Sequence, residues 1–185
     1  MADILFINAC ARPNSRTLEL AKHVLGKLEG DVEEVYLYGI ELPPLDFAGM
    51  QVRGAADESG DFSDSVFDLA KQFASAKTVV IAAPYWDLMF PSVVKTYFES
   101  VTVSGLTFEY GDNGIPRGLC KAERLIYVTT SGGPIIYNFG YDYVSALAKM
   151  FYGINEVKCF SAQKLDIFGS DATAILEKAK SEIAL

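Results

Sequence analysis

The sequence has little of the chemistry that metal centres and disulfide frameworks require. It contains three cysteines, Cys10, Cys120 and Cys159, and a single histidine, His23. The cysteines are far apart, odd in number and form no Cys-x-x-Cys pair, which argues for reduced thiols. One histidine without neighbouring cysteines or paired carboxylates makes a poor metal site. We therefore expect no bound metal and a structural or solvent-facing role for His23.

Positive charge and long apolar runs are also scarce. The chain has 16 Lys and Arg against 24 Asp and Glu, and its formal net charge is −8. This balance repels a polyanion, so nucleic acid is excluded as a partner. No apolar run approaches the roughly 20 residues of a membrane span, and the start of the chain lacks the basic region and cleavage site of a signal peptide. We expect a cytoplasmic protein without a membrane segment.

Apolar residues, by contrast, are abundant and follow a regular order. They make up 50% of the 185 residues, enough for the core of one domain spanning 1–185. Short apolar runs predict strands at 4–8, 32–38, 78–83, 123–129 and 157–160, and helical periodicity predicts helices at 18–28, 62–74, 92–101, 141–152 and 171–183. This alternation indicates a doubly wound α/β fold, a five-stranded parallel sheet in the order 2-1-3-4-5 with helices on both faces.

Two stretches interrupt the alternation. Residues 39–60 and 103–120 are rich in glycine and contain proline, which is typical of loops. We expect both to be long surface excursions that border a ligand cleft or a partner subunit.

The loop after the first predicted strand, ACARPNSRT at 9–17, could receive a phosphate. The hydroxyls of Ser15 and Thr17, the free N–H groups of the helix start, and Arg12 or Arg16 are suitable donors. The structural alternative is an ordinary helix cap by Ser15 with both arginines in solvent.

The loops after the third and fourth strands could hold a flat ring. AAPYWDLMFP at 82–91 carries more large apolar side chains than a surface turn needs, and TTSGGP at 129–134 has paired glycines that let the backbone approach a ligand. Asp87 in the former could contact the ligand or cap the next helix. The alternatives are a helix-packing or dimer patch and a plain turn. Because all three loops follow strands of one parallel sheet, we expect them at one edge.

The stretch AAPYWDLMFPSVVKTYFESVTVSGLTFEY at 82–110 makes a family resemblance specific. A proline, an aromatic loop, a helix with Lys95 and Phe98, and a Gly-Leu-Thr-Phe segment occur in sequence. The chain here resembles the flavodoxin-like quinone reductases and FMN-dependent NADH-azoreductases, and the similarity spans nearly the whole domain. The resemblance implies a flavodoxin-like fold, FMN as the cofactor, and NADH or NADPH as the hydride donor to a quinone, azo compound or similar small acceptor.

The resemblance also assigns residues to the flavin. The first loop would contact the FMN phosphate through the hydroxyls of Ser15 and Thr17 and through Arg12. The second loop would border the isoalloxazine with Pro84, Tyr85, Trp86, Asp87 and Leu88, and the third would contact its pyrimidine edge with Thr130, Ser131, Gly132 and Gly133. Two positions depart from the family pattern. Ala9 replaces a serine, and no histidine follows the glycine pair, so Tyr137 or Asn138 would contact the substrate. The flavin would carry the chemistry, without a catalytic acid, base or nucleophile from the chain. The family also implies a homodimer with the cleft at its interface.

Two other functions remain as alternatives at this point. Cys10 and Arg16 have the spacing of the low-molecular-weight phosphatase signature, in which a thiolate attacks a cradled phosphate. Against it stand the absence of an Asp-Pro motif and the presence of Pro13, which removes a donor from the cradle. The second alternative is a flavodoxin that only carries electrons and has no nicotinamide site, although the first loop lacks the glycine of such carriers.

Overall fold

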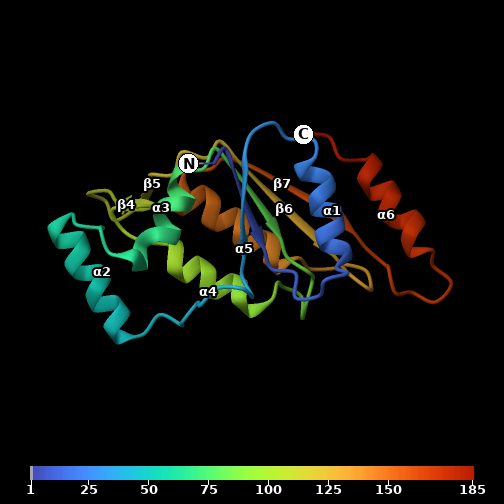
Figure 1. The fold of residues 1–185 in the computed structure, drawn as a ribbon, viewed down its shortest axis with the longest axis horizontal. Coiled ribbons are helices and arrows are strands. Elements are labelled where there is room, and N and C mark those ends of the chain that lie inside the picture. The colour runs from blue at the N-terminus through green and yellow to red at the C-terminus, as the bar shows by residue number, and fades with distance from the viewer. Residues whose placement is uncertain (1) are drawn as a thin grey trace.

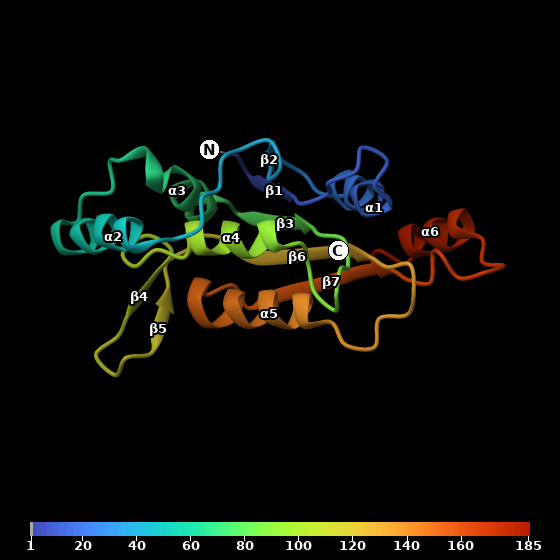
Figure 2. The same cartoon turned by 90° about the horizontal axis from the view of Figure 1, so that it is seen from below.

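The computed structural model describes residues 2–185 and is built around a parallel five-stranded sheet in the order β2-β1-β3-β6-β7 (Figures 1 and 2). Its strands are β1 (Ile4–Asn8), β2 (Val32–Tyr36), β3 (Thr78–Ala82), β6 (Arg124–Thr130) and β7 (Glu156–Ala162). β1 and β3 are buried along their whole length, as their continuous apolar runs predict. The five strands and their parallel pairing agree with the sequence prediction.

Alternate residues of each central strand pack against different helices. Leu5, Ile7 and Val79 face the cluster with α3 (Asp68–Ser75), α4 (Ser92–Val101) and α5 (Phe139–Leu147). Ile4, Phe6 and Val80 face the cluster with α1 (Arg16–Leu25) and α6 (Ala172–Ser181). Since successive strand side chains point to opposite faces, this division gives the sheet two apolar cores. Helices therefore cover both faces, as predicted (Figure 2).

Several predicted boundaries were wrong. The helix expected at 62–74 begins as a short 3₁₀ turn, η1 (Ser65–Phe67). Asp64 caps this turn, because its side chain accepts a hydrogen bond from the Val66 N–H. The helix expected at 141–152 begins earlier, at the Asn138 cap, and its last turn is π-helical, η2 (Ala148–Tyr152). Gly153, with φ 76°, ends that turn in the left-handed conformation that glycine adopts without strain.

The two predicted excursions contain regular structure. Residues 103–120 include a hairpin of β4 (Phe108–Tyr110) and β5 (Pro116–Gly118), which is separate from the main sheet. Residues 39–60 include the helix α2 (Phe47–Ser59), capped by Asp46 and ended by Gly60. We call residues 39–60 the α2 arm. Only Ala56 of α2 is buried, so the weak apolar periodicity that hid the helix in the sequence reflects its exposure.

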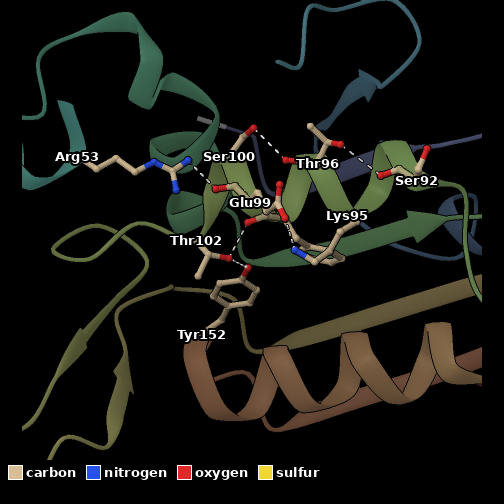
Figure 3. A network of polar contacts seen from close by, with 9 residues as sticks. Arg53, Ser92, Lys95, Thr96, Glu99, Ser100, Thr102 and Tyr152 are labelled. Atoms are coloured by element: carbon tan, nitrogen blue, oxygen red, sulfur yellow. Dashed lines mark hydrogen bonds and ion pairs between the residues drawn. The ribbon is translucent and has the colours of Figure 1, made fainter. Parts of the chain in front are cut away.

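The α2 arm extends at one end of the molecule, opposite α6 (Figures 1 and 2). Its clearest polar anchor is Arg53, whose Nη2 donates to the Glu99 carbonyl at the end of α4, at 2.6 Å (Figure 3). Burial lowers the pKa of Arg53, whereas nearby Glu99 opposes that shift. Glu99 also forms an ion pair with Lys95 on α4. One half-buried guanidinium thus joins the arm to the body of the protein.

Among residues 2–185, no helix is long and apolar enough to cross a membrane. The same residues contain no group of three or more His, Cys, Asp or Glu side chains placed to hold a metal ion. All three cysteines are free thiols.

Candidate functional site

A pocket of about 340 Å³ lies at the carboxyl edge of the sheet. Its walls come from the loops after β1 and β3, from the end of β6 and from the segment after β7, where parallel sheets bind their ligands. The residues that line it are Arg12, Asn14, Ser15, Arg16, Thr17, Pro84, Tyr85, Trp86, Thr130, Ser131, Gly132 and Asp166. The three loops singled out in the sequence therefore meet at one site.

The start of α1 supplies the polar end of this pocket. Ser15 caps the helix, and its Oγ accepts a hydrogen bond from the Leu18 N–H at 3.3 Å. The first-turn N–H groups of a helix have no acceptor within it, and the helix dipole makes that end positive. Arg12 and Asn14 are exposed beside it. The structure thus shows Ser15 as a helix cap, and the same residue also lines the pocket.

A buried hydroxyl pair ties this helix to the end of β6. Thr17 Oγ1 and Thr130 Oγ1 are 2.6 Å apart, and Thr17 is almost fully buried. The Tyr85 N–H donates to the Thr130 carbonyl at 3.1 Å, which joins the loop after β3 to the same strand end. These contacts fix the three walls relative to one another without any contribution from a ligand.

The loop after β3 makes a tight turn at Trp86–Met89. Trp86 and Met89 exchange two backbone hydrogen bonds, of 2.9 and 2.8 Å, around Asp87 and Leu88. Asp87 and Leu88 have φ values of 50° and 69°, the left-handed region that a leucine occupies only at a cost. The turn places Pro84, Tyr85 and Trp86 on the pocket and leaves Asp87 and Leu88 exposed at its tip. Strain of this kind is common near functional sites.

The two glycines of the loop after β6 also differ in their position relative to the pocket. Gly132 lines the pocket, and a Cβ at Gly132 would collide with the Asp166 carboxylate. Gly133 does not line it, and a Cβ there would have nothing within 4 Å. Tyr137 lies nearby and exposed, with its carbonyl accepting from the Tyr85 hydroxyl at 2.7 Å and its ring stacked on Phe139. Nine of the twelve predicted residues line the pocket: Arg12, Ser15, Thr17, Pro84, Tyr85, Trp86, Thr130, Ser131 and Gly132.

Three residues that line the pocket are absent from the predicted flavin contacts: Asn14, Arg16 and Asp166. From the residues alone, Arg16 was a candidate phosphate donor beside Arg12 and a candidate phosphatase residue, but the resemblance assigned only Arg12 to the flavin. Asn14 lies between Arg12 and Ser15 in the same loop. Asp166 follows β7, and the carboxyl end of a parallel strand beside β6 is the signal that could have found it.

Cys10 has the wrong environment for a phosphatase nucleophile. Its side chain is buried, and its Sγ lies 3.8 Å from the Ala82 carbonyl oxygen. Burial raises the pKa of the Cys10 thiol to about 11, with nearby Glu34 acting in the same direction and Ser15 opposing it. A nucleophilic cysteine needs a lowered pKa, so Cys10 stays a neutral thiol at pH 7. Cys10 is not among the residues lining the pocket.

The fold and the position of the pocket define a flavodoxin-like α/β protein. The family model described as "Flavodoxin-like fold" matches residues 2–185, and the chain belongs to this family. An FMN-dependent NADH:quinone oxidoreductase from Coprothermobacter proteolyticus is 31% identical, with 98% of this chain and 96% of the relative covered. An FMN-dependent NADH:quinone oxidoreductase 2 from Clostridium acetobutylicum is 30% identical, with 98% of each covered.

Solved structures support the same fold. An azoreductase from Bacillus anthracis superposes with a TM-score of 0.85 at 23% identity, covering 98% of this chain and 96% of that one. An FMN-dependent NADH-azoreductase from the same species, in complex with FMN, gives a TM-score of 0.79 at 24% identity, with 98% and 95% covered. At these identities the similarity establishes the fold alone.

Proposed function

We propose that this protein is an FMN-dependent oxidoreductase that transfers a hydride from NADH to a quinone, an azo compound or a similar small acceptor. The observation that carries the proposal is one pocket lined both by a polar, electropositive helix start and by the segment Pro84–Trp86 with its two aromatic side chains. FMN has the matching halves, a phosphate and a flat ring. The names of the two relatives support the cofactor, the donor and the quinone.

The pocket residues fit FMN on donor chemistry. Ser15, Thr17 and the first-turn N–H groups of α1 would bind the phosphate, with Arg12 beside them. Tyr85 and Trp86 would border the ring, and Ser131 and Gly132 would meet its polar edge. Gly132 lines the pocket, and its missing Cβ leaves room for the Asp166 carboxylate beside it. Bound FMN would supply the hydride chemistry, while the chain orients both reactants.

Three predicted flavin contacts are assigned to the rim of the pocket instead of its walls: Asp87, Leu88 and Gly133. They lie beyond the walls of the pocket, at the tip of the Trp86–Met89 turn and after Gly132. A nicotinamide or acceptor above the ring would reach this rim, together with the exposed ring of Tyr137. We assign Tyr137 a contact with the acceptor, because its carbonyl accepts a hydrogen bond from the hydroxyl of Tyr85, which lines the pocket.

The proposal includes a single domain over 1–185, which works as a cytoplasmic homodimer. The exposed apolar side chains Phe47 and Met50 on α2, at 71% and 54% exposure, support a covering partner. The family match over 2–185 supports one domain, and three free thiols suit a reducing compartment.

Anaerobic reduction tests the function. The protein is loaded with FMN, freed of excess and mixed with NADH, and the flavin absorbance is followed before and after a simple quinone is added. We expect NADH to bleach the flavin and the quinone to restore it. Flavin that binds but stays oxidised with NADH, while a separate reductase reduces it, would favour an electron carrier instead.

A further inference from the structure

An ion pair crosses one wall of the pocket and is not needed to explain FMN binding. Arg16, the first residue of α1, reaches to the segment after β7, where its Nη2 lies 2.8 Å from Asp166 Oδ1. Its Nη1 donates to the Leu165 carbonyl at 3.2 Å. Both Arg16 and Asp166 line the pocket. The guanidinium at the helix start is thus held by a carboxylate and a carbonyl of the segment after β7.

The backbone fixes Asp166 in this position. The N–H groups of Lys164, Leu165 and Asp166 donate to the carbonyls of Gly133, Ser131 and Gly132, at 3.1, 3.2 and 3.0 Å. The carboxylate lies against the Cα of Gly132, in the space that a side chain would fill. Asp166 therefore has a rigid support, whereas the long side chain of Arg16 has rotatable bonds through which it can turn.

The pairing has an electrostatic consequence for a phosphate at the start of α1. Arg16 alone would be a full positive charge with a planar set of donors suited to phosphate. Paired with Asp166, it presents a nearly neutral unit, with two of its donors already occupied. The pair is partly exposed, at 31% and 63%, so water moderates the attraction and Arg16 can be released.

We propose that Asp166 is a specificity-determining positioning residue, which holds Arg16 away from the phosphate of the flavin and thereby limits the preference for FMN over unphosphorylated riboflavin. The inference rests on the proposed function, since it concerns the same site. Phosphate recognition is then left to Ser15, Thr17 and the helix start. Asp166 acts through Arg16, not through contact with the ring.

The test compares dissociation constants for FMN and riboflavin in four proteins: the parent, Asp166→Asn, Arg16→Met and the double variant. The ratio of the two constants isolates the phosphate, because the ring and ribityl chain are common to both ligands. We expect Asp166→Asn to raise the preference for FMN by about three- to tenfold, as released Arg16 reaches the phosphate. In the Arg16→Met background the same change should give a gain smaller by about threefold or more. Asp112→Asn, in the exposed turn between β4 and β5, is the charge-matched control and should leave the ratio unchanged.

Three results overturn the inference. An unchanged ratio shows that Asp166 does not affect the phosphate. Equal gains with and without Arg16 show that Asp166 acts only by its own charge. Equal losses of FMN and riboflavin affinity in Asp166→Asn show that Asp166 has only a structural role in the pocket wall. A parent that binds neither flavin overturns the proposed function and the inference with it, whereas an unchanged ratio in a parent that binds FMN overturns the inference alone.

Discussion

The carboxyl edge of the sheet and the α2 arm hold their side chains by different means. At the edge, Thr17, Thr130 and Tyr85 are joined by hydrogen bonds within and between the loops. In the arm, α2 buries only Ala56, and Arg53 donates a hydrogen bond to the Glu99 carbonyl of α4. The first region is organised in an isolated chain and suits a small ligand. The second exposes apolar side chains of α2, such as Phe47 and Met50, and suits a partner surface.

The largest expected effect concerns the buried hydroxyl pair at the edge. Thr17→Val leaves the Thr130 hydroxyl without its partner and removes a phosphate donor, so we expect FMN affinity to fall by about 1–3 kcal/mol, roughly five- to 150-fold. Flavin fluorescence during titration measures it. Thr96→Val on α4, whose hydroxyl makes only a long 3.4 Å bond to the Ser92 carbonyl, is the matched control and should bind FMN like the parent. Equal losses in both variants would contradict a specific role for Thr17.

The neighbouring glycines Gly132 and Gly133 test which part of the carboxyl edge forms the pocket wall. Gly132→Ala places a methyl group where the Asp166 carboxylate lies, so the pocket backbone at Ser131 and Gly132 has to shift and we expect FMN affinity to fall by about 1 kcal/mol. Gly133→Ala has open space and should change affinity little. Neither glycine has a positive φ, so alanine brings no backbone strain at either position. Isothermal titration calorimetry of both variants checks the difference, and a larger loss at Gly133 would contradict the proposed pocket walls.

The arm should respond in stability and not in flavin affinity. Arg53→Ala removes the hydrogen bond to the Glu99 carbonyl, and we expect the free energy of unfolding to fall by about 1 kcal/mol, reduced from a fully buried charged bond by solvent. Limited proteolysis should cut faster within 39–60, while FMN titration gives the parent's affinity. Lys95→Ala, which removes the Lys95–Glu99 ion pair without touching the arm, should leave the proteolysis rate unchanged. A loss of FMN affinity in Arg53→Ala would show that the two regions are coupled.

The smallest effect is expected from Cys10. Its pKa is raised to about 11 in the folded protein from 9.0, so the neutral thiol contributes stability that is fully present below pH 9 and is lost as the pH rises through 11. Cys10→Ala should therefore flatten the decline in melting temperature between pH 9 and 11. At pH 7 its NADH oxidation should stay within about a few-fold of the parent, because the flavin carries the chemistry. If Cys10→Ala abolished turnover at pH 7, the interpretation of Cys10 as a nucleophile would be favoured again.

The central fold could be predicted because its signals are local. The buried strands Ile4–Asn8 and Thr78–Ala82 are continuous apolar runs, and α4 was predicted at its observed bounds. The helix α2 could not be, because an exposed helix has no apolar stripe, and Pro43, Pro44 and four glycines in 39–60 favour a loop. The hairpin of β4 and β5 is too short to carry a period.

The site was predictable in position and less so in detail. The rule that ligands bind at the carboxyl ends of parallel strands placed Ser15, Trp86 and Gly132 together. It could not show that a turn at Asp87 and Leu88 directs them away from the pocket, because that depends on two left-handed residues, one of them a leucine. Nor could it pair Arg16 with Asp166, which are 150 residues apart.

Amide hydrogen exchange with and without FMN tests whether the flavin binds at the carboxyl edge and not at the arm. FMN should slow exchange in the segments around Ser15, Trp86 and Ser131. It should leave the α2 arm unchanged, including the separate hollow of about 480 Å³ that Leu42, Pro44 and Val66 help to line. Protection confined to 39–60, with the loops after β1, β3 and β6 exchanging as before, would contradict the account.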